Sequence, residues 1–234
     1  MSKKSLGVPR HVAIIPDGNR RWAKKHGLKP WEGHFKGIGD LAEEVAWTVF
    51  DMGVEYLTVW GGSYDNLTKR SKVEIRMLNE AYRMFIKKVL ADKKTYDREV
   101  RVRFIGETDV LEKNTLKLIK KVESSTKAHR RFNLTILVAY NGDRELLSAI
   151  NKLLRSGEKT VTAEGFRSAL WTGKFPIIDL VIRTGGEYRL STFMPWDVGY
   201  AELYFSEKMW PAFTKTDLKK AVEDYKTRER RFGK

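Results

Sequence analysis

The sequence predicts a single α/β domain in which a mostly parallel sheet of six strands is flanked by helices. Two observations carry this prediction. Short apolar or β-branched runs, typical of buried strands, alternate along the chain with longer stretches whose apolar residues recur at helical spacing. The 234 residues also contain no internal repeat, low-complexity tract or linker that would divide the chain. Alternating strands and helices favour βαβ units, in which neighbouring strands run parallel.

Six segments have the composition of buried strands, and the first of them is the clearest. Residues His11–Ile15 form an apolar run that stops at Pro16 and the turn-forming residues after it. The second segment is rich in β-branched and aromatic residues, and the fifth is continuously apolar. The predicted strands are residues 11–15, 55–60, 100–105, 134–140, 178–182 and 202–205.

Helices are expected between these strands. In residues 33–52, apolar side chains such as Leu41, Val45 and Val49 recur at helical spacing, and Gly53 ends the pattern. The polar residues 61–71 are expected to form a loop, and residues 1–10 to be flexible. The other predicted helices are residues 72–94, 108–128, 143–156, 162–171 and 214–230.

The chain carries a strong positive charge. Lys and Arg number 45 against 30 Asp and Glu, which gives a formal net charge of +15. Such a balance indicates anionic partners: nucleic acid, an acidic membrane surface or phosphorylated small molecules. Nucleic acid is the least favoured of these, because the sequence has no zinc-finger or RNA-recognition signature. The absence of cysteine excludes disulfides, thiolate metal sites and cysteine nucleophiles.

The sequence lacks the segments that direct a chain to or through a membrane. No window of about 18 apolar residues is present, and the N-terminal segment lacks the apolar core of a secretory signal. We therefore expect a cytoplasmic protein. The lysines exceed what a single binding site needs, so peripheral contact with an anionic membrane is a further hypothesis.

Polar segments follow the predicted strands. In an open parallel sheet, ligands bind beyond the carboxyl ends of the strands, so these segments are where chemistry is expected. They are rich in Gly, Arg, Asn and Ser. Glycine lets the backbone approach a ligand, main-chain amides can point toward it, and arginine binds phosphate with two donors. The sequence thus predicts an oxyanion site built from residues 17–21, 61–66, 141–144 and 183–191.

Three stretches of the chain also carry a family resemblance. Residues 11–23 read HVAIIPDGNRRWA, residues 179–191 read DLVIRTGGEYRLS, and residues 200–205 read YAELYF, with Trp210-Pro211 after them. In order and spacing they resemble the cis-prenyltransferases, the family of undecaprenyl diphosphate synthase. The similarity extends from His11 to the terminal residues 231–233, Arg-Phe-Gly.

The resemblance implies an enzyme that condenses isopentenyl diphosphate with an allylic prenyl diphosphate to form a Z-isoprenyl diphosphate. It also implies Mg²⁺ as cofactor and a hydrophobic tunnel that holds the growing chain. A homodimer is implied as well, with residues 214–234, the C-terminal helix and tail, at the dimer interface.

The matched motifs assign roles residue by residue. By this resemblance, Asp17 would hold Mg²⁺ on the departing diphosphate, and Glu202 would be a second metal carboxylate. His34 and Asn66 match positions that assist the leaving group or the proton, so they join Asp17 as predicted catalytic residues. The predicted substrate-binding residues are Gly18, Asn19, Arg20, Arg21, Trp22, Ser63, Arg183, Glu187, Arg189, Ser191, Arg231 and Gly233.

The sequence departs from the family at several positions. Pro30 replaces an arginine that helps to bind the allylic diphosphate, and Arg20 replaces a small residue; we hypothesise that Arg20 restores the lost charge. Residues 62–67, GSYDNL, keep the family's Ser and Asn but lack the Phe and Trp that line the space near both substrates. Irregular, head-to-middle coupling of allylic diphosphates is therefore an alternative. A non-catalytic partner subunit is another, although the retained Asp17 and the matched arginines argue against it.

Overall fold

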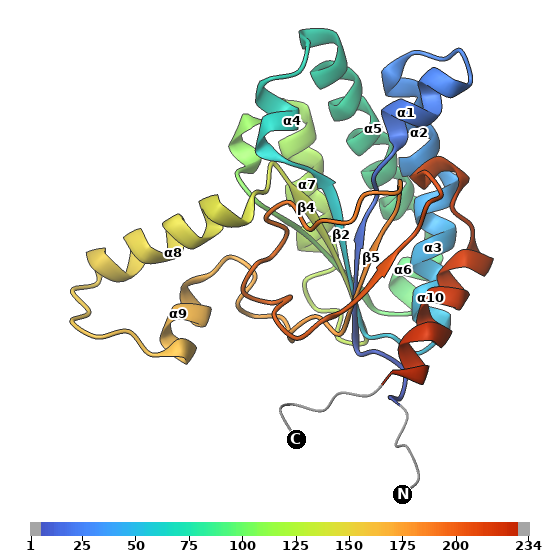
Figure 1. Ribbon diagram of the computed structural model, residues 1–234. Helices are drawn as coiled ribbons and strands as arrows, with labels where there is room; N and C mark the ends of the chain where they lie inside the picture. The colour runs from blue at the N-terminus through green and yellow to red at the C-terminus, as the bar shows by residue number, and fades with distance from the viewer. Residues whose placement is uncertain (1–5, 229–234) are drawn as a thin grey trace, which may run out of the picture.

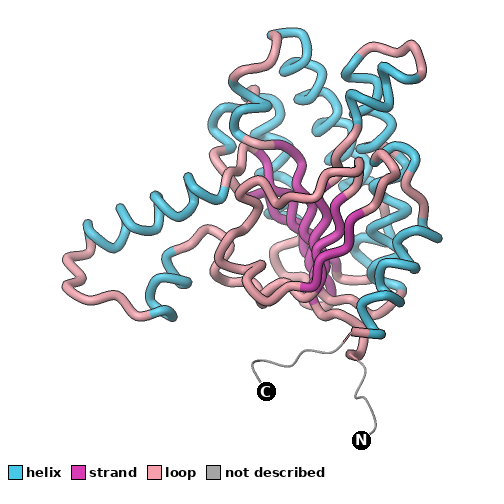
Figure 2. Tube along the Cα trace, in the orientation of Figure 1, coloured by secondary structure: helices cyan, strands magenta, loops and turns pink. Residues whose placement is uncertain are grey.

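Six parallel strands form one sheet at the centre of the structure, a computed structural model that describes residues 6–228 (Figures 1 and 2). The strand order is β3-β4-β2-β1-β5-β6, and every neighbouring pair runs parallel. The predicted fold class is confirmed, and the sheet is parallel throughout rather than mostly. The strands are β1 His11–Ile15, β2 Tyr56–Gly62, β3 Val100–Ile105, β4 Phe132–Val138, β5 Leu180–Arg183 and β6 Glu202–Phe205.

Helices cover both faces of this sheet, and two short 3₁₀ turns, Thr108–Val110 and Trp210–Ala212, join them in the described part of the chain. None of the helices within residues 6–228 is long and apolar enough to cross a bilayer. The α-helices are α1 Asn19–Lys25, α2 Pro30–Ile38, α3 Asp40–Asp51, α4 Tyr64–Thr68, α5 Lys72–Ala91, α6 Lys93–Asp97, α7 Lys113–Ser125, α8 Gly142–Arg155, α9 Ala163–Ala169 and α10 Lys215–Thr227.

The helix predicted over residues 33–52 is in fact two helices. α2 begins earlier, at Pro30, since proline suits the first turn of a helix. It ends at Gly39, whose ψ of −126° cannot continue a helix, and α3 starts at Asp40. The break separates two roles: α2 packs on α1 and α5 beside the carboxyl ends of the strands, while α3 packs on α10.

Other predicted boundaries are wrong in smaller ways. The predicted loop over residues 61–71 contains α4, because the Ser63 hydroxyl caps a helix by accepting from Asn66 N. The helix predicted over residues 108–128 is a 3₁₀ turn followed by α7. β4 starts two residues earlier than predicted and stops before Ala139, whose φ is +50°. The short helices α1 and α6 were not predicted.

The core lies on both faces of the sheet, and β1 and β4 are buried along their whole length. On one face, α3, α5, α7 and α10 supply the larger apolar cluster. On the other face, Phe193 and Met194 from the loop after β5 pack under the sheet. α8 and α9 project away from the sheet, as Figure 1 shows, and share a small cluster of their own. The core does not fill the carboxyl ends of the central strands, where a ligand cavity opens.

Candidate active site

A cavity of about 850 Å³ opens at the carboxyl ends of β1, β2 and β5. Its mouth is polar and cationic, and its interior is apolar. The mouth is lined by Asp17, Gly18, Asn19, Arg20, Arg21, Lys24, His34, Ser63, Asn66, Arg70, Arg183 and Ser191. The interior is lined by Ile38, Ala42, Ala46, Leu57, Val59, Tyr82, Phe85, Phe104, Leu134 and Ile136.

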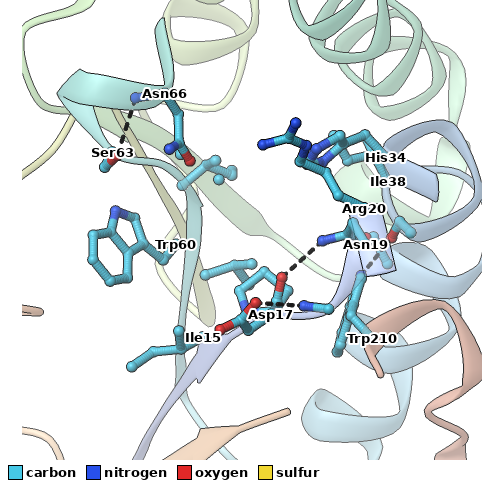
Figure 3. Close-up of a pocket in the computed structure, with 18 of the residues that line it drawn as sticks. Ile15, Asp17, Asn19, Arg20, His34, Ile38, Trp60, Ser63, Asn66 and Trp210 are labelled. Atoms are coloured by element: carbon cyan, nitrogen blue, oxygen red, sulfur yellow. Dashed lines mark hydrogen bonds between the residues drawn. The ribbon is translucent and has the colours of Figure 1, made fainter. Parts of the chain in front are cut away.

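The structure brings most of the predicted site residues to this mouth. Figure 3 shows Ser63 and Asn66 on one wall, Arg20 and His34 on the opposite wall, and Asp17 between them. Trp22 does not line the cavity and instead stacks on His26, with ring centroids 4.1 Å apart. The predicted residues that line the cavity are Asp17, Gly18, Asn19, Arg20, Arg21, His34, Ser63, Asn66, Arg183 and Ser191.

Asp17 is held by three donors. Gly18 N donates to Oδ1 at 2.5 Å, and Arg183 Nη2 donates to Oδ2 at 2.8 Å. Arg21 Nη2 also reaches Oδ1, at 3.3 Å. The carboxylate is nevertheless about one-third exposed, at 31%. Asp17 is therefore fixed in orientation and still open to a ligand in the mouth.

Two glycines let the loops around Asp17 approach each other. Gly18 has a φ of +100°, and a Cβ there would lie 2.8 Å from Cβ of Met209. Gly185 has a φ of +90°, and its Cβ would lie 2.9 Å from Nη2 of Arg21. An L side chain is disfavoured at such φ values, and the space is already occupied. Gly18 thus lets the loop after β1 approach the segment after β6, and Gly185 lets the loop after β5 approach Asp17 and Arg21.

Asn19 lies where α1, α2 and the Trp210 segment meet. Its Nδ2 donates to Pro16 O at 2.8 Å, whereas its buried Oδ1 has no hydrogen-bond partner among the described residues. A Cβ at Gly37 would lie 2.6 Å from that oxygen and 2.5 Å from the Trp210 ring. The missing side chain at position 37 therefore makes room for the Asn19 amide beside the mouth.

The loop after β5 presents its polar groups through strained backbone. Ser191, Thr192 and Met194 all have positive φ, between 39° and 62°. Arg183 Nη1 donates to Ser191 Oγ at 3.1 Å and also to the carbonyl of Arg189. Non-glycine residues in this region cost about 1–3 kcal/mol each and persist where surrounding contacts hold them. Here the nearly buried Arg183 guanidinium holds Ser191, while main-chain bonds from Gly142 to Thr192 O and from Asp197 to Met194 O hold the other two.

Glu187 and Arg189 lie next to the mouth without lining the cavity. Glu187 Oε1 pairs with Arg21 Nη1 at 3.1 Å, and its Oε2 accepts from Arg189 Nη1 at 2.5 Å. Arg21 and Arg189 are thus joined through one carboxylate. Because Arg189 is mostly exposed, at 59%, it can turn toward a ligand without breaking the core.

His34 sits in a cationic, buried environment. Arg70 Nη1 donates to His34 Nε2 over 3.0 Å. Burial, together with the neighbouring Arg70 and Arg20, lowers the pKa of His34 to about 3. The ring is therefore neutral at neutral pH, and its predicted role in assisting the leaving group or the proton stays a prediction.

The predicted metal pair, Asp17 and Glu202, does not form within one chain. Glu202 opens β6 and lies in register with Leu180, at the amino end of β5. Asp17 follows the carboxyl end of β1, where Ile15 lies in register with Arg183. The Glu202 carboxylate is bound instead to Arg228 Nη1, at 2.9 Å. The first and last residues of parallel strands stand at opposite ends of the sheet, so one chain does not bring the two carboxylates together, and the metal-binding role of Glu202 stays a prediction.

The donors at the mouth still suit a magnesium ion that is shared with a substrate. No cluster of three His, Cys, Asp or Glu side chains that could hold a metal by itself occurs within residues 6–228. Mg²⁺ is commonly held by one or two carboxylates together with substrate phosphates and water. Asp17, partly exposed and surrounded by arginine, asparagine and serine side chains, fits that donor set. The predicted Arg231 and Gly233 lie outside the described residues.

Comparison with known proteins identifies the family. Residues 15–233 match the family model described as "Putative undecaprenyl diphosphate synthase". The chain belongs to this family, the cis-prenyltransferases. An isoprenyl transferase from Thermotoga maritima is 43% identical over 97% of this chain and 98% of its own length. A tritrans,polycis-undecaprenyl-diphosphate synthase (geranylgeranyl-diphosphate specific) from Archaeoglobus fulgidus is 39% identical over 97% of this chain and 93% of its own.

Solved structures agree with these relatives. The crystal structure of lavandulyl diphosphate synthase from Lavandula x intermedia, in complex with dimethylallyl diphosphate, superposes with a TM-score of 0.88. It is 31% identical and covers 97% of this cis-prenyltransferase and 99% of the solved chain. The predicted family and its prenyl-transfer activity are thereby confirmed.

Two mouth residues of this cis-prenyltransferase, Lys24 and Arg70, escaped the sequence analysis. Arg70 stands in a polar stretch, residues 68–72, between two lysines. The signal that distinguishes it is tertiary: it bonds to His34, which is 36 positions away. Tyr82 and Phe85, which lie in the helix predicted over residues 72–94, line the apolar interior of the cavity.

Proposed function

We propose that this cavity extends an allylic prenyl diphosphate with isopentenyl diphosphate, and that the starter is geranylgeranyl diphosphate. The observation that carries the proposal is the single continuous cavity with a cationic mouth and an apolar interior. Diphosphates suit the mouth and prenyl chains suit the interior. We infer this starter from archaeal relatives that are 36–39% identical and are named as specific for geranylgeranyl diphosphate.

Cleavage of the allylic C–O bond leaves diphosphate, so the mouth must stabilise developing negative charge. Arg21, beside Asp17, is placed to bind that leaving group with two parallel donors. The isopentenyl diphosphate is held on the other side by Ser191, Arg183 and Arg189. Binding phosphate would draw Arg183 and Arg21 away from Asp17 and free its carboxylate oxygens.

Asp17 is the residue of this chain that would hold Mg²⁺. When bound, the ion supplies charge neutralisation on the departing diphosphate. Asn66, whose side chain points into the cavity in Figure 3, then orients the substrates above Asp17. Apolar side chains deeper in the cavity exclude water and receive the growing chain as a tunnel, which brings the two reacting carbons together.

A homodimer is the assembly we propose. α8 exposes Leu147, Ile150 and Leu154 along one face, with exposed fractions of 59%, 43% and 69%. Three large apolar side chains on a projecting helix favour a covered surface. β6 is also an unpaired edge of the sheet within the described residues. A metal-binding role for Glu202 requires such a second copy, because its own chain keeps it away from Asp17.

The proposal is tested by comparing four allylic diphosphates as starters. Purified protein with Mg²⁺ is incubated with dimethylallyl, geranyl, farnesyl or geranylgeranyl diphosphate, each with and without labelled isopentenyl diphosphate, and the products are sized by mass spectrometry. We expect Z-polyprenyl products that need isopentenyl diphosphate, formed fastest from geranylgeranyl diphosphate. No incorporation with any starter would contradict the catalytic proposal. Omission of Mg²⁺ or addition of EDTA should abolish turnover.

Irregular coupling is the second candidate, and one feature favours it. Gly62 stands where the family has Phe, and a Cβ there would lie 2.9 Å from the Tyr82 hydroxyl. That hydroxyl donates to Gly61 O at 3.0 Å and closes part of this wall. The cavity wall beside Gly62 is therefore formed by Tyr82 and differs in shape from a wall formed by Phe. Branched products formed from dimethylallyl diphosphate alone would identify this activity.

A further inference from the structure

The segment after β4 does not enter the cavity. The predicted oxyanion site includes residues 141–144, but none of them lines the mouth or the interior. Arg144, on the first turn of α8, bonds instead to Glu107 in the loop after β3. Its Nη2 donates to Oε1 at 2.8 Å, and its Nε donates to Oε2. A guanidinium that is held by both oxygens of one carboxylate has a fixed plane.

The Tyr64 ring packs on a face of this guanidinium. Arg144 Cζ lies 3.8 Å from the centroid of the ring, well inside the range of about 6 Å for cation–π contacts. The backbone of the same residue is bound from the same segment, because Tyr64 N donates to Asn141 Oδ1 at 3.0 Å. Tyr64 is the first residue of α4. The segment after β4 therefore holds the start of α4 by both its ring and its backbone.

α4 needs such anchors because it is too short to be stable by itself. It has only the five residues Tyr64–Thr68, and isolated helices shorter than about 12–15 residues are marginal in water. Its cap, the Ser63 hydroxyl, is local and does not tie the helix to the sheet. Leu67, buried at 3% exposure, attaches it to the core at one point. The Tyr64 contact supplies a second point of attachment, and two points fix the direction of the helix.

The direction of α4 matters because of the residues beside Tyr64. Ser63 and Asn66 both line the cavity, and Figure 3 shows the Asn66 side chain directed into it. The Tyr64 ring does not line the cavity. Residues two positions apart on a helix point to different sides, so the ring faces Arg144 while the Asn66 amide faces the cavity. A rotation of α4 that freed the ring would turn the amide away.

We propose that Arg144 is a positioning residue for prenyl transfer, which fixes Tyr64 and thereby the direction in which α4 presents Asn66 to the substrates. The inference rests on the proposed function, in which Asn66 orients the substrates, and adds to it a support outside the cavity. Glu107, Arg144 and Tyr64 follow the neighbouring strands β3, β4 and β2, so their contacts cross the carboxyl end of the sheet. Arg144 acts through α4 and not on the reacting atoms.

The test is a double-mutant cycle between Arg144 and Asn66. Arg144→Ala should lower kcat about tenfold, because the substrates are oriented less well, and change both KM values by less than about threefold. In the Asn66→Ala background the same substitution should lower kcat by less than about twofold, because no amide is left to position. A contribution of Arg144 to the fold alone would lower kcat equally in both backgrounds. Steady-state kinetics measure the cycle, and far-UV circular dichroism checks that each variant folds.

Substitutions at Tyr64 test the same contact from the other side. Tyr64→Phe keeps the ring and should keep kcat within about twofold, whereas Tyr64→Ala should reproduce the loss seen in Arg144→Ala and add nothing to it. Arg144→Lys keeps a cation without the fork and should recover part of the rate. Arg131→Ala is the matched control, because Arg131 also lies over an aromatic ring, Phe132, at 5.2 Å, but at the amino end of β4. It should leave kcat unchanged.

Hydrogen exchange separates this inference from the proposed function, because it needs no substrate. In Arg144→Ala, the amides of residues 63–69 should exchange about tenfold faster, while those of β1 should not change. Unchanged exchange of α4, or an equal loss of kcat with and without Asn66, would overturn the inference. A wild-type protein that transfers no prenyl group would reject the proposed function, while faster exchange in Arg144→Ala would retain Arg144 as the anchor of α4.

Discussion

Arg183 Nη2 donates to Asp17 Oδ2 at 2.8 Å and so joins the ends of β5 and β1 across the mouth of the cavity. The two partners are unequal: the Arg183 side chain is 5% exposed and the Asp17 side chain 31%. The arginine is therefore part of the scaffold, and the aspartate is the partner that a ligand can reach. A phosphate that binds Arg183 competes directly with Asp17, which couples substrate binding to the release of the carboxylate.

Replacing Asp17 tests this relationship. Asp17→Asn keeps the size of the side chain but removes its charge, so kcat should fall by about 10²–10³, the usual loss for one key electrostatic group. Unfolding free energy should fall by only about 1–3 kcal/mol, because Arg183 keeps a hydrogen-bonding oxygen. Steady-state kinetics and urea denaturation measure both. Asp65→Asn, in an exposed ion pair on α4, is the control. Retention of more than about a tenth of kcat would contradict the role of Asp17.

Gly185 tests whether the close packing at the mouth positions Arg21, and Gly157 serves as the control glycine. Both have positive φ, of 90° and 76°, but a Cβ at Gly185 would meet Arg21 and Asp17, whereas one at Gly157 would meet nothing within 4 Å. Gly157→Ala should cost only backbone strain, about 1–2 kcal/mol of stability. Gly185→Ala should carry that cost and also raise the allylic KM severalfold, since Arg21 must move. Equal allylic KM values in the two variants would show that Arg21 binds the substrate without needing the close contact with Gly185.

The sequence predicted best the elements whose signal is local. β1 was recognised because four successive apolar residues after His11 end at a Pro-Asp-Gly turn, and all five residues of the strand are buried. α1 was missed because it is seven residues long, mostly charged, and buries only Ala23. The break at Gly39 carries no proline or polar cluster, so the apolar spacing continues through it.

The site was predictable where a motif follows a strand, since all such segments meet at one edge of a parallel sheet. It was not predictable where a role depends on a distant partner. Arg70 lines the cavity and bonds to His34 from a distant part of the chain, and burial together with Arg70 lowers the pKa of His34. Glu202 belongs to a matching motif but stands at the amino end of the strands, away from Asp17 of the same chain.

Product length should depend on the floor of the cavity. Ala46, Phe85 and Leu134 line both the main cavity and a second pocket of about 40 Å³ behind it. Ala46→Phe should block the floor and shorten the main product, while Phe85→Ala should join the two spaces and lengthen it. Mass spectrometry of the products measures the shift. Met84→Ala, at an exposed neighbour of Phe85, should leave the length unchanged. Identical products from all three variants would place the growing chain elsewhere.

His11 should make the protein less stable in mild acid. It is fully buried: Nδ1 donates to Pro176 O at 2.9 Å, and Nε2 accepts from Thr58 Oγ1 at 2.8 Å. Burial lowers its pKa to about 4. Between that value and the unfolded pKa near 6.5, only the unfolded chain takes up the proton, so stability is lost as the pH falls. From pH 7 to 5 the loss is about 2 kcal/mol. Urea denaturation of His11→Gln should show a weaker pH dependence by that amount, and an unchanged dependence would contradict the assignment.

Asp197 should act in the opposite sense. It is buried beside Glu145 and Arg167, accepts from Thr172 Oγ1 at 3.0 Å, and burial raises its pKa to about 6. Between the ordinary value of 3.8 and that pKa, the folded protein binds the proton more tightly, so this group lowers stability as the pH rises. The cost reaches about 3 kcal/mol by pH 7.

Asp197→Asn removes this titration and keeps an oxygen for Thr172. Relative to the wild type, the variant should therefore gain stability between pH 4 and pH 7, measured as the difference in unfolding free energy at the two values. Glu145→Gln provides the companion variant, because its carboxylate faces the same Thr172 hydroxyl at 2.8 Å and contributes to the raised pKa of Asp197. Removing the Glu145 charge should lower the pKa of Asp197 and so shrink the gain from Asp197→Asn. A gain of equal size in both backgrounds would mean that the two carboxylates do not interact.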